Sequence, residues 1–298
     1  MTSAALETPE TITFHRRSEL PGVEVRTLRN SNKPWRRYAT EFEFLAPSSW
    51  QAQMWHRRRE AVIAPGFLLC AHPGEVFAAE RVLVRGSANS LTVDAKVLRE
   101  YVAEHELPPE RLRLRAVSRM SNGLLGRLFE VFTTVRPGPT AMEIQASMVE
   151  FVAALVGELL DESATPSSKP TVDSRAAERI RQCLHADPSV TIDLTTLAKQ
   201  AGMSRFRVLR VFKRRFGLPP HTYQLQLRLG LAQKSLREGL HPAEVAAEYG
   251  FVDQSHLTRH FKRLLGVTPA QYARVAAQSG PNEPLSVPDP EAWNAAAY

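Results

Sequence analysis

The sequence predicts a two-domain α+β protein, with an N-terminal β-barrel and trailing helices followed by a C-terminal all-α domain. Three observations support this prediction. The chain has 298 residues, which is more than one ordinary domain needs. Residues 172–275 carry 17 Lys and Arg against 8 Asp and Glu, whereas residues 1–171 carry 21 against 20, so the excess positive charge is local. The hydrophobic pattern also changes from short runs to helical periodicity after Leu91.

The predicted domain boundaries follow these changes. We expect a disordered start in 1–10, an N-terminal domain in 11–162 (barrel 11–90, helices 91–162), a linker in 163–172, a helical domain in 173–275 and a flexible tail in 276–298. The linker lies in the polar segment DESATPSSKP.

Short apolar runs in the barrel region are separated by turn-forming pairs such as Pro21-Gly22 and Pro65-Gly66, a spacing typical of a small sandwich or barrel of strands. These runs are 23–28, 38–45, 50–55, 61–63, 67–70 and 81–84.

Helical periodicity follows in 92–105, 121–132 and 140–160. The third segment has an apolar stripe formed by Ile144, Met148, Val152, Leu155 and Leu159. Two interpretations stay open: the stripe is a dimerisation seam, or it packs on the sheet of its own domain.

The helical domain contains an internal repeat. Residues 197–223 read LAKQAGMSRFRVLRVFKRRFGLPPHTY, and residues 245–272 read VAAEYGFVDQSHLTRHFKRLLGVTPAQY, with one extra residue at the turn. Both copies contain Arg-x-Phe-Lys at equivalent positions, beginning at Arg210 and Arg259. A match of this density indicates two copies of one structural unit.

Each copy has the pattern of a helix-turn-helix, at about 194–216 and 242–265. A small alanine permits close helix crossing, a glycine forms the turn, a polar residue caps the second helix and a further glycine ends it. These roles fall on Ala198, Gly202, Ser204 and Gly217 in the first copy, and on Ala246, Gly250, Asp253 and Gly266 in the second.

The second helix of each unit is predicted to have an apolar inner face, with Val208 and Phe212 or Leu257 and Phe261, and a cationic outer face suited to the major groove. Outward residues expected to reach base edges are Arg205, Phe206, Arg210, Gln254, Ser255, Thr258 and Arg259. Residues assigned to backbone phosphates are Arg207, Lys213, Arg214, His256, Lys262 and Arg263.

A helix predicted over 221–237 joins the two units. Its roughly 16 residues span about 24 Å, which is compatible with units that enter successive major grooves about 34 Å apart. One chain would then cover nearly two turns of DNA.

Composition narrows the protein class. Cys70 and Cys183 are the two cysteines, which excludes a disulfide scaffold or a four-thiolate metal site within one chain. The N-terminal segment lacks the basic region followed by an apolar region that is typical of a signal peptide. The apolar stretches are too short to span a membrane. We therefore expect a cytoplasmic protein without a membrane partner.

The repeat resembles the AraC/XylS family of bacterial transcription regulators, most closely in GFVDQSHLTRHFKRLLGVTPAQYAR, and the resemblance covers about 192–274. It implies a seven-helix domain in which both units contact one face of double-stranded DNA. The family's base-reading positions fall on the residues named above and also on Leu209, where a polar residue is common. That leucine either contacts a thymine methyl group or packs.

The stretch APGFLLCAHPGEVF, 64–77, resembles the family's cupin-like effector domain. Many relatives have His where Phe77 stands, and His56 and His72 are isolated, so we expect neither a metal nor another cofactor. We hypothesise a small-molecule site at the barrel mouth, although each aromatic taken singly is also a candidate core residue. Its expected lining is Trp35, Arg37, Phe42, Trp55 and Arg57.

These features predict a sequence-specific DNA-binding regulator at the nucleoid, responsive to a small molecule, and not an enzyme. Activation of transcription is the family's commoner mode of regulation and would add RNA polymerase as a partner. A homodimer is expected if the apolar stripe of 140–160 is a dimerisation seam. One alternative is an N-terminal domain that only dimerises or binds a partner protein. Another is a cupin-type enzyme fused to a DNA-binding domain, which the missing metal ligands disfavour. An alkyl-transfer repair protein would need more than two cysteines.

Overall fold

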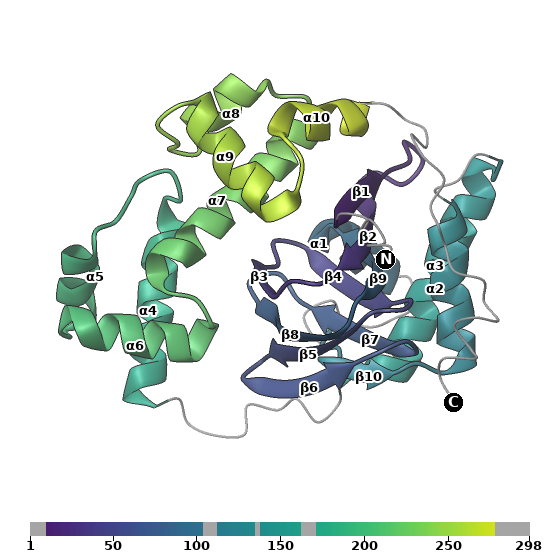
Figure 1. The fold of residues 1–298 in the computed structure, drawn as a ribbon, viewed down its shortest axis with the longest axis horizontal. Helices are drawn as coiled ribbons and strands as arrows, with labels where there is room; N and C mark the ends of the chain where they lie inside the picture. Colours follow the sequence, from purple (N-terminus) through teal and green to yellow (C-terminus); the bar gives the residue numbers. More distant parts are fainter. Residues whose placement is uncertain (1–9, 104–111, 135–137, 162–170, 278–298) are drawn as a thin grey trace, which may run out of the picture.

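The computed structural model describes residues 10–103, 112–134, 138–161 and 171–277 (Figure 1). The predicted disordered start, linker and tail lie almost wholly outside these ranges. A β-rich domain lies at the right of Figure 1, and a helical domain forms the left and upper parts. The α+β, two-domain fold class is confirmed.

The N-terminal domain has two antiparallel sheets in its described part. One has the strand order β1-β2-β9-β4-β7-β10 and the other β3-β8-β5-β6. The strands are β1 (Thr11–His15), β2 (Val23–Ser31), β3 (Trp35–Tyr38), β4 (Phe42–Pro47), β5 (Gln51–His56), β6 (Arg59–Ile63), β7 (Phe67–Ala71), β8 (Val76–Val84), β9 (Gly86–Val93) and β10 (Val117–Arg119). The two sheets enclose a core that contains Trp50, Met54 and Phe77, all almost inaccessible to solvent.

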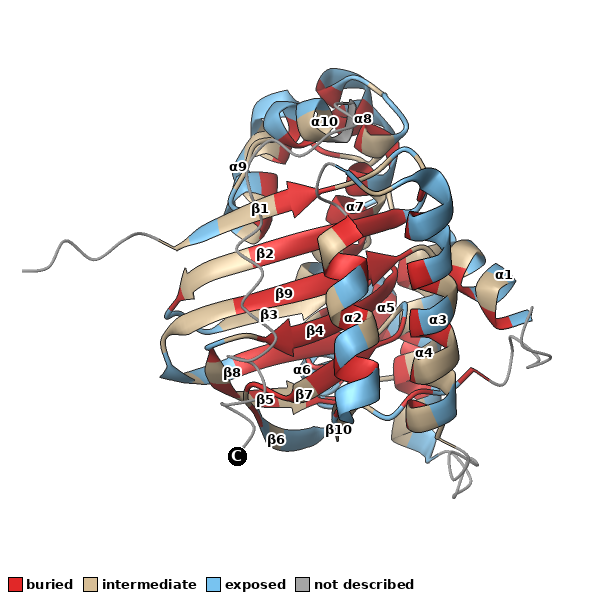
Figure 2. Cartoon of the chain, turned by 90° about the vertical axis from the view of Figure 1, so that its right-hand side faces the viewer, coloured by how far each residue is buried: buried red, intermediate tan, exposed pale blue. Residues whose placement is uncertain are grey.

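Three helices cover the other face of the six-stranded sheet: α1 (Ala95–Ala103), α2 (Asn122–Thr134) and α3 (Ala141–Leu159). In Figure 2, α2 and α3 lie across the buried strands. The α3 side chains Ile144, Met148, Val152, Leu155 and Leu159 are all buried in this core. The stripe therefore packs on its own sheet and presents no exposed dimerisation seam.

Several strand and helix limits differ from the sequence prediction. The run 38–45 is two strands, because β3 ends at Tyr38 and β4 begins at Phe42. The helix expected from Thr92 begins at Ala95, because Thr92 and Val93 belong to β9. β9 escaped prediction because it buries polar residues, including Asn89, Ser90 and Thr92, and so lacks a simple apolar alternation.

The helical domain has the seven helices that the family resemblance implies, all within the described ranges. They are α4 (Val172–Ala186), α5 (Leu194–Ala201), α6 (Arg205–Phe216), α7 (Pro220–Arg237), α8 (Pro242–Glu248), α9 (Gln254–Leu265) and α10 (Pro269–Ala277). In Figure 1, α7 runs diagonally from the group of α4 to α6 up to the group of α8 to α10. None of the helices in the described ranges is long and apolar enough to cross a lipid bilayer.

Each half of the helical domain shares its small core with the β-rich domain. Tyr38, Trp55 and Val76 pack into the core of the first half, which includes Phe212 and Tyr223. Phe14 and Ile12 of β1 pack into the core of the second half. Burial of these side chains gives the two domains a separate apolar contact near each end of α7.

Candidate nucleic-acid interface and effector pocket

The second helix of each helix-turn-helix unit begins at the expected capping residue. Ser204 Oγ accepts a hydrogen bond from the Arg207 N–H at 3.4 Å, and Asp253 Oδ1 accepts one from the His256 N–H at 2.6 Å. Gly217 and Gly266 end the helices in the left-handed conformation, with φ of 79° and 78°. α6 and α9 therefore have matched ends and the same length of 12 residues.

Apolar and polar residues lie on different faces of α6 and α9, as the sequence periodicity predicts. Val208, Phe212, Leu257 and Phe261 are fully buried, and each anchors its helix to the domain. Thr258 is half-buried, and the other residues expected to read bases are exposed: Arg205, Phe206, Leu209, Arg210, Gln254, Ser255 and Arg259. The outer faces are thus accessible to a duplex in this structure.

The residues assigned to phosphates fall into two groups. Lys213, Arg214, Lys262 and Arg263 are exposed in the last turns of α6 and α9. Arg207 instead pairs with Asp173 at 2.9 Å, and His256 Nδ1 accepts a hydrogen bond from the Val252 N–H at 3.3 Å. A phosphate would have to compete with these internal partners.

Arg228 of α7 has a structural role that the sequence pattern did not reveal. Its buried guanidinium donates to the carbonyl oxygens of Pro188 and Ser189 in the first half of the domain and of Gly250 in the second. A hydrogen bond to Thr191 Oγ1 at 3.0 Å adds to the first set. One side chain therefore ties the loop just before the first helix-turn-helix unit to the turn of the second, which helps to keep the two units at a constant separation.

The histidines of the barrel have structural partners. His56 Nε2 lies 2.9 Å from Glu75 Oε2, and His72 Nε2 accepts a hydrogen bond from the Leu114 N–H at 3.2 Å. Burial lowers the pKa of His72 to about 4, so this ring is neutral at ordinary pH. Within the described ranges, no group of three or more His, Cys, Asp and Glu is arranged to hold a metal ion.

The five residues expected to line an effector site do not share one pocket. Trp35 and Arg37 line a cavity between the two domains, whereas Trp55 and Arg57 line a separate cleft. Phe42 lines neither of these and is buried beside Phe44 under the helices of the N-terminal domain. The expectation of a single barrel-mouth site is therefore corrected, because β3 and the β5–β6 hairpin face different surroundings.

The interdomain cavity has a volume of about 660 Å³. Its walls come from β1, β2, β3, β4 and β9 on one side and from α7 and α9 on the other. Apolar side chains such as Leu28, Leu45 and Leu229 alternate with four arginines and one lysine, whereas Glu10 is the one acidic residue in the lining among the described residues. The cavity is thus amphipathic. Three of its arginines already have carboxylate partners: Arg26 with Glu24, Arg36 with Glu80 and Arg37 with Glu43.

Three buried polar atoms on residues of this cavity have no hydrogen-bond partner among the described residues: Trp35 Nε1, Arg37 Nη2 and Gln226 Oε1. Burial lowers the pKa of Arg37, and the pull of Glu43, 3.5 Å away, only partly offsets this. Unpaired buried donors and acceptors are costly, and they indicate a place where a ligand can supply the missing bonds.

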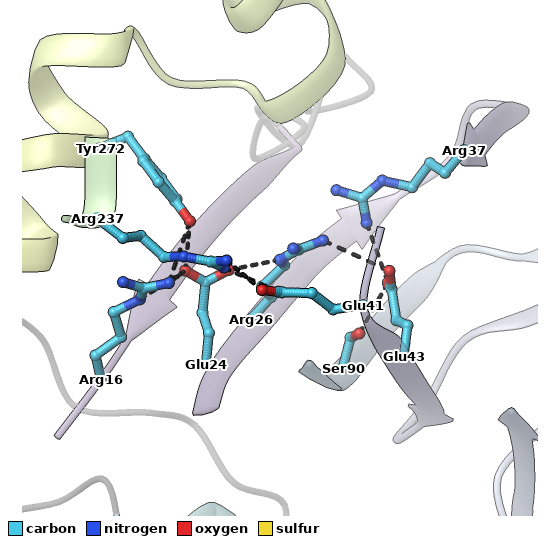
Figure 3. A network of polar contacts seen from close by, with 9 residues as sticks. All are labelled: Arg16, Glu24, Arg26, Arg37, Glu41, Glu43, Ser90, Arg237 and Tyr272. Atoms are coloured by element: carbon cyan, nitrogen blue, oxygen red, sulfur yellow. Dashed lines mark hydrogen bonds and ion pairs between the residues drawn. The ribbon is translucent and has the colours of Figure 1, made fainter. Parts of the chain in front are cut away.

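A network of buried charges connects this cavity to the helical domain (Figure 3). Arg26, which lines the cavity, donates to Glu24 at 2.9 Å, and Glu24 accepts a hydrogen bond from the Tyr272 hydroxyl of α10 at 2.7 Å. Burial acts to raise the pKa of Glu24, but the charges of Arg16 and Arg26 outweigh it and hold that pKa far below its usual range.

Arg237 of α7 adds an ion pair between the domains. It pairs with Glu41, which lies just before β4, and both side chains are almost buried. Arg37 and Ser90 meet at Glu43 on the cavity side, where the Ser90 hydroxyl donates to Glu43 Oε1 at 2.9 Å. Charged groups of the pocket, Arg237 of α7 and the Tyr272 hydroxyl of α10 therefore belong to one polar cluster (Figure 3).

Comparison with known proteins agrees with this arrangement. A family model described as a helix-turn-helix domain matches residues 197–274. A putative AraC-like transcription regulator from Streptomyces lividans is 37% identical over 93 residues, which are 31% of this chain and 31% of that protein. The chain therefore spans about a third of the length of this curated relative. The probable transcription factor PqrA from Proteus vulgaris is 35% identical over 82 residues, covering 27% of this chain and 67% of that protein.

A solved structure extends the likeness of the fold to both domains. The apo crystal structure of a ToxT variant from Vibrio cholerae superposes with a TM-score of 0.51 and 12% identity, covering 88% of this chain and all of that one. The duplicated helix-turn-helix, its capped recognition helices and these similarities lead to one conclusion. The chain belongs to the AraC/XylS family of DNA-binding transcription regulators.

Proposed function

We propose that this regulator is an activator that reads two successive major grooves with α6 and α9, and that a small organic anion in the interdomain cavity controls it. It would act at the nucleoid in the cytoplasm, with DNA and RNA polymerase as partners. A homodimer, if it forms, would need a surface other than the α3 stripe, which is buried in its own domain.

One observation carries the DNA part of the proposal. The two recognition helices expose outer faces rich in cationic and polar residues, while their inner faces are fully buried, and the buried Arg228 links the two halves of the domain. A pair of helices presented in this way can enter the major groove without rearrangement of the domain.

The test of DNA reading begins with duplexes selected from a random library by the full-length chain. Arg210→Ala and Arg259→Ala should each lose about 1 to 3 kcal/mol on the selected site and relax its sequence preference. Lys213→Ala, a phosphate contact on the same helix as Arg210, should weaken selected and random duplexes alike. Equal losses of the arginine variants on both kinds of duplex would refute their role as base readers. Footprinting should show protection of about two helical turns per chain.

The class of effector follows from the cavity lining. Lys33, Arg263 and the unpartnered Nη2 of Arg37 favour an anionic group, and the leucines beside them favour an apolar body. An anion at Arg37 would pair with the nitrogen that now lacks a partner, and it would compete with Glu43. Because Arg263 and Leu264 of α9 line the same cavity, such a ligand would touch the second recognition helix directly.

The test of the effector site uses a series of aliphatic and aromatic carboxylates, with the matching neutral amides. Carboxylates that bind should raise the melting temperature and change DNA affinity, and the amides should do so much less. Arg37→Gln should abolish the response, whereas Arg81→Gln, an exposed residue of β8 outside the cavity, should retain it. If no anion changes either quantity, the N-terminal domain acts instead through a partner protein or through dimerisation.

The direction of regulation is tested by transcription in vitro from a promoter that carries the selected site. An activator should raise the amount of transcript in the presence of RNA polymerase. A fall in transcript on adding the chain would mean that it is a repressor.

A further inference from the structure

A second cleft, of about 890 Å³, lies where the hairpin between β5 and β6 meets the C-terminal end of α6. Six arginines from three separate parts of the chain line it, together with three acidic residues. The arginines are Arg57, Arg58 and Arg59 of the hairpin, Arg113 and Arg115 before β10, and Arg215 of α6.

All three acidic residues, Glu60, Glu75 and Asp161, already have interactions inside the protein. Glu75 binds Arg57 at 2.8 Å and His56 at 2.9 Å, and Glu60 accepts a hydrogen bond from Gln53 at 2.7 Å. Arg57 also donates to the Leu114 carbonyl oxygen at 2.7 Å, which holds its guanidinium in place. The other five arginines are exposed, and none forms an ion pair within the described ranges.

The hairpin has an unusual backbone at this cleft. Arg57 and Arg58 have φ of 48° and 65°, in the left-handed region, at a turn where Asn and Gly are the usual residues. Two side chains with a Cβ are strained in this conformation. Such strain concentrates at functional sites, and here it directs consecutive arginines to one surface.

One wall of the cleft is the recognition helix of the first helix-turn-helix unit. Arg215 and Phe216 line the cleft in the last turn of α6, which also carries Lys213 and Arg214, assigned to phosphates; at 100° per residue Arg215 lies about 200° around the helix from Lys213. We propose that the arginine cleft holds backbone phosphates of the DNA next to the site read by α6. The β-rich domain would then take part in DNA binding directly. This inference rests on the proposed reading of DNA by α6.

The exposure of the arginines favours DNA over a small phosphorylated ligand. A small-molecule site buries most of its ligand, whereas five of these six guanidiniums remain open to solvent. Backbone phosphates stay half-solvated when bound, and guanidinium groups are well suited to bind them. The interdomain cavity, whose residues include buried polar atoms without a partner among the described residues, is the better site for a small molecule.

The test measures how the affinity of the full-length chain for its selected duplex changes as the salt concentration rises from about 50 to about 200 mM. The variant with Arg58→Gln, Arg59→Gln and Arg115→Gln should show a slope of log affinity against log salt that is smaller by about 0.9 for each phosphate that it no longer neutralises. Its affinity should fall equally on selected and random duplexes. Arg99→Gln, an exposed arginine of α1 outside the cleft, should leave the slope unchanged.

A second arm shortens the duplex on the side of the first unit until only the recognition sites remain. The wild-type chain should lose affinity on the short duplex, and the triple variant should bind long and short duplexes equally. An unchanged salt slope in the triple variant overturns the inference, as does binding of inorganic pyrophosphate to the cleft with no effect of duplex length. Either result leaves sequence-specific reading intact, whereas a wild-type chain without sequence preference overturns both proposals.

Discussion

Phe206 and Leu209 are apolar residues on a helix face that otherwise carries arginines. Phe206 is 83% exposed and Leu209 is 37% exposed, so neither stabilises the fold by full burial. In the major groove, apolar side chains distinguish thymine by contact with its C5 methyl group. At the scale of single residues, α6 thus combines apolar and cationic contacts, whereas the outer face of α9 begins with the polar Gln254 and Ser255.

We predict that replacing thymine by uracil in the half-site read by α6 weakens wild-type binding about 4-fold for each methyl group contacted, since such a group contributes about 0.8 kcal/mol when buried. Phe206→Ala should bind more weakly and lose most of this sensitivity. Competition binding on matched thymine and uracil duplexes measures both effects. Val252→Ala, which truncates an 86% exposed residue outside the helix, serves as the control. Equal sensitivity of wild type and Phe206→Ala would exclude the methyl contact.

His72 makes the stability of the β-rich domain depend on pH. Burial holds its pKa at about 4 in the folded chain, below the ordinary value of 6.5, so the unfolded state binds the proton more readily. The resulting stabilisation is fully present above pH 6.5 and is lost as the pH falls toward 4, with a total on the order of 3 kcal/mol. Urea unfolding at pH 5 and pH 7 should show this decline, and His72→Gln should have a shallower one. Parallel curves would mean that His72 is not the group responsible.

At the scale of elements, α7 is packed on nearly all sides. Gly230 faces Thr40 so closely that a Cβ at this position would overlap the threonine side chain. Gly217 at the end of α6 is similarly close to Trp55. The contact between the helical and β-rich domains therefore depends on backbone approach at two glycines.

Gly230→Ala is expected to destabilise the protein by about 1 to 3 kcal/mol, because overpacking forces α7 and the barrel apart. Gly157→Ala in α3 is the matched control, since no atom lies within 4 Å of its added Cβ, and it should stabilise the helix by up to about 1 kcal/mol. Urea unfolding followed by circular dichroism measures both. If Gly230→Ala is as stable as the wild type, the domains do not dock through α7 as described.

At the scale of the whole molecule, the DNA-binding and β-rich domains form one ionic and apolar unit. Glu24 and Tyr272, which are 248 residues apart in sequence, share a hydrogen bond, and Arg237 pairs with Glu41 across the same interface. Arg26 and Arg37 connect this cluster to the cavity. A ligand that repositions either arginine would therefore alter the attachment of α7 and α10.

Arg237→Gln tests this attachment. The change leaves Glu41 buried without its counter-charge, and the expected loss of stability is about 3 to 5 kcal/mol. We expect calorimetry to show two unfolding transitions in place of one as the domains separate. Lys234→Gln is the control: Lys234 lies on the same helix as Arg237 and forms a more exposed ion pair with Asp94 of the β-rich domain, so its loss should cost less than about 1 kcal/mol. A single unshifted transition in Arg237→Gln would show that the domains do not depend on this ion pair.

The sequence by itself determined the features that arise from local pattern. The repeat, the caps at Ser204 and Asp253, the glycine ends and the outward faces of α6 and α9 could all be predicted, because helix periodicity and capping depend on residues within a few positions of one another. The observed helices α5, α6, α8 and α9 lie within the segments expected for the two units.

Only the tertiary structure decided the features that depend on distant pairs. It assigned the α3 stripe to the core, separated Trp35 and Arg37 from Trp55 and Arg57, and placed Arg228 between the two units. A sheet brings together strands that are far apart in the chain, and a cavity is what remains after all side chains have packed. The sequence pattern could therefore name residues for an effector site, but the interdomain cavity and its charge network required the fold.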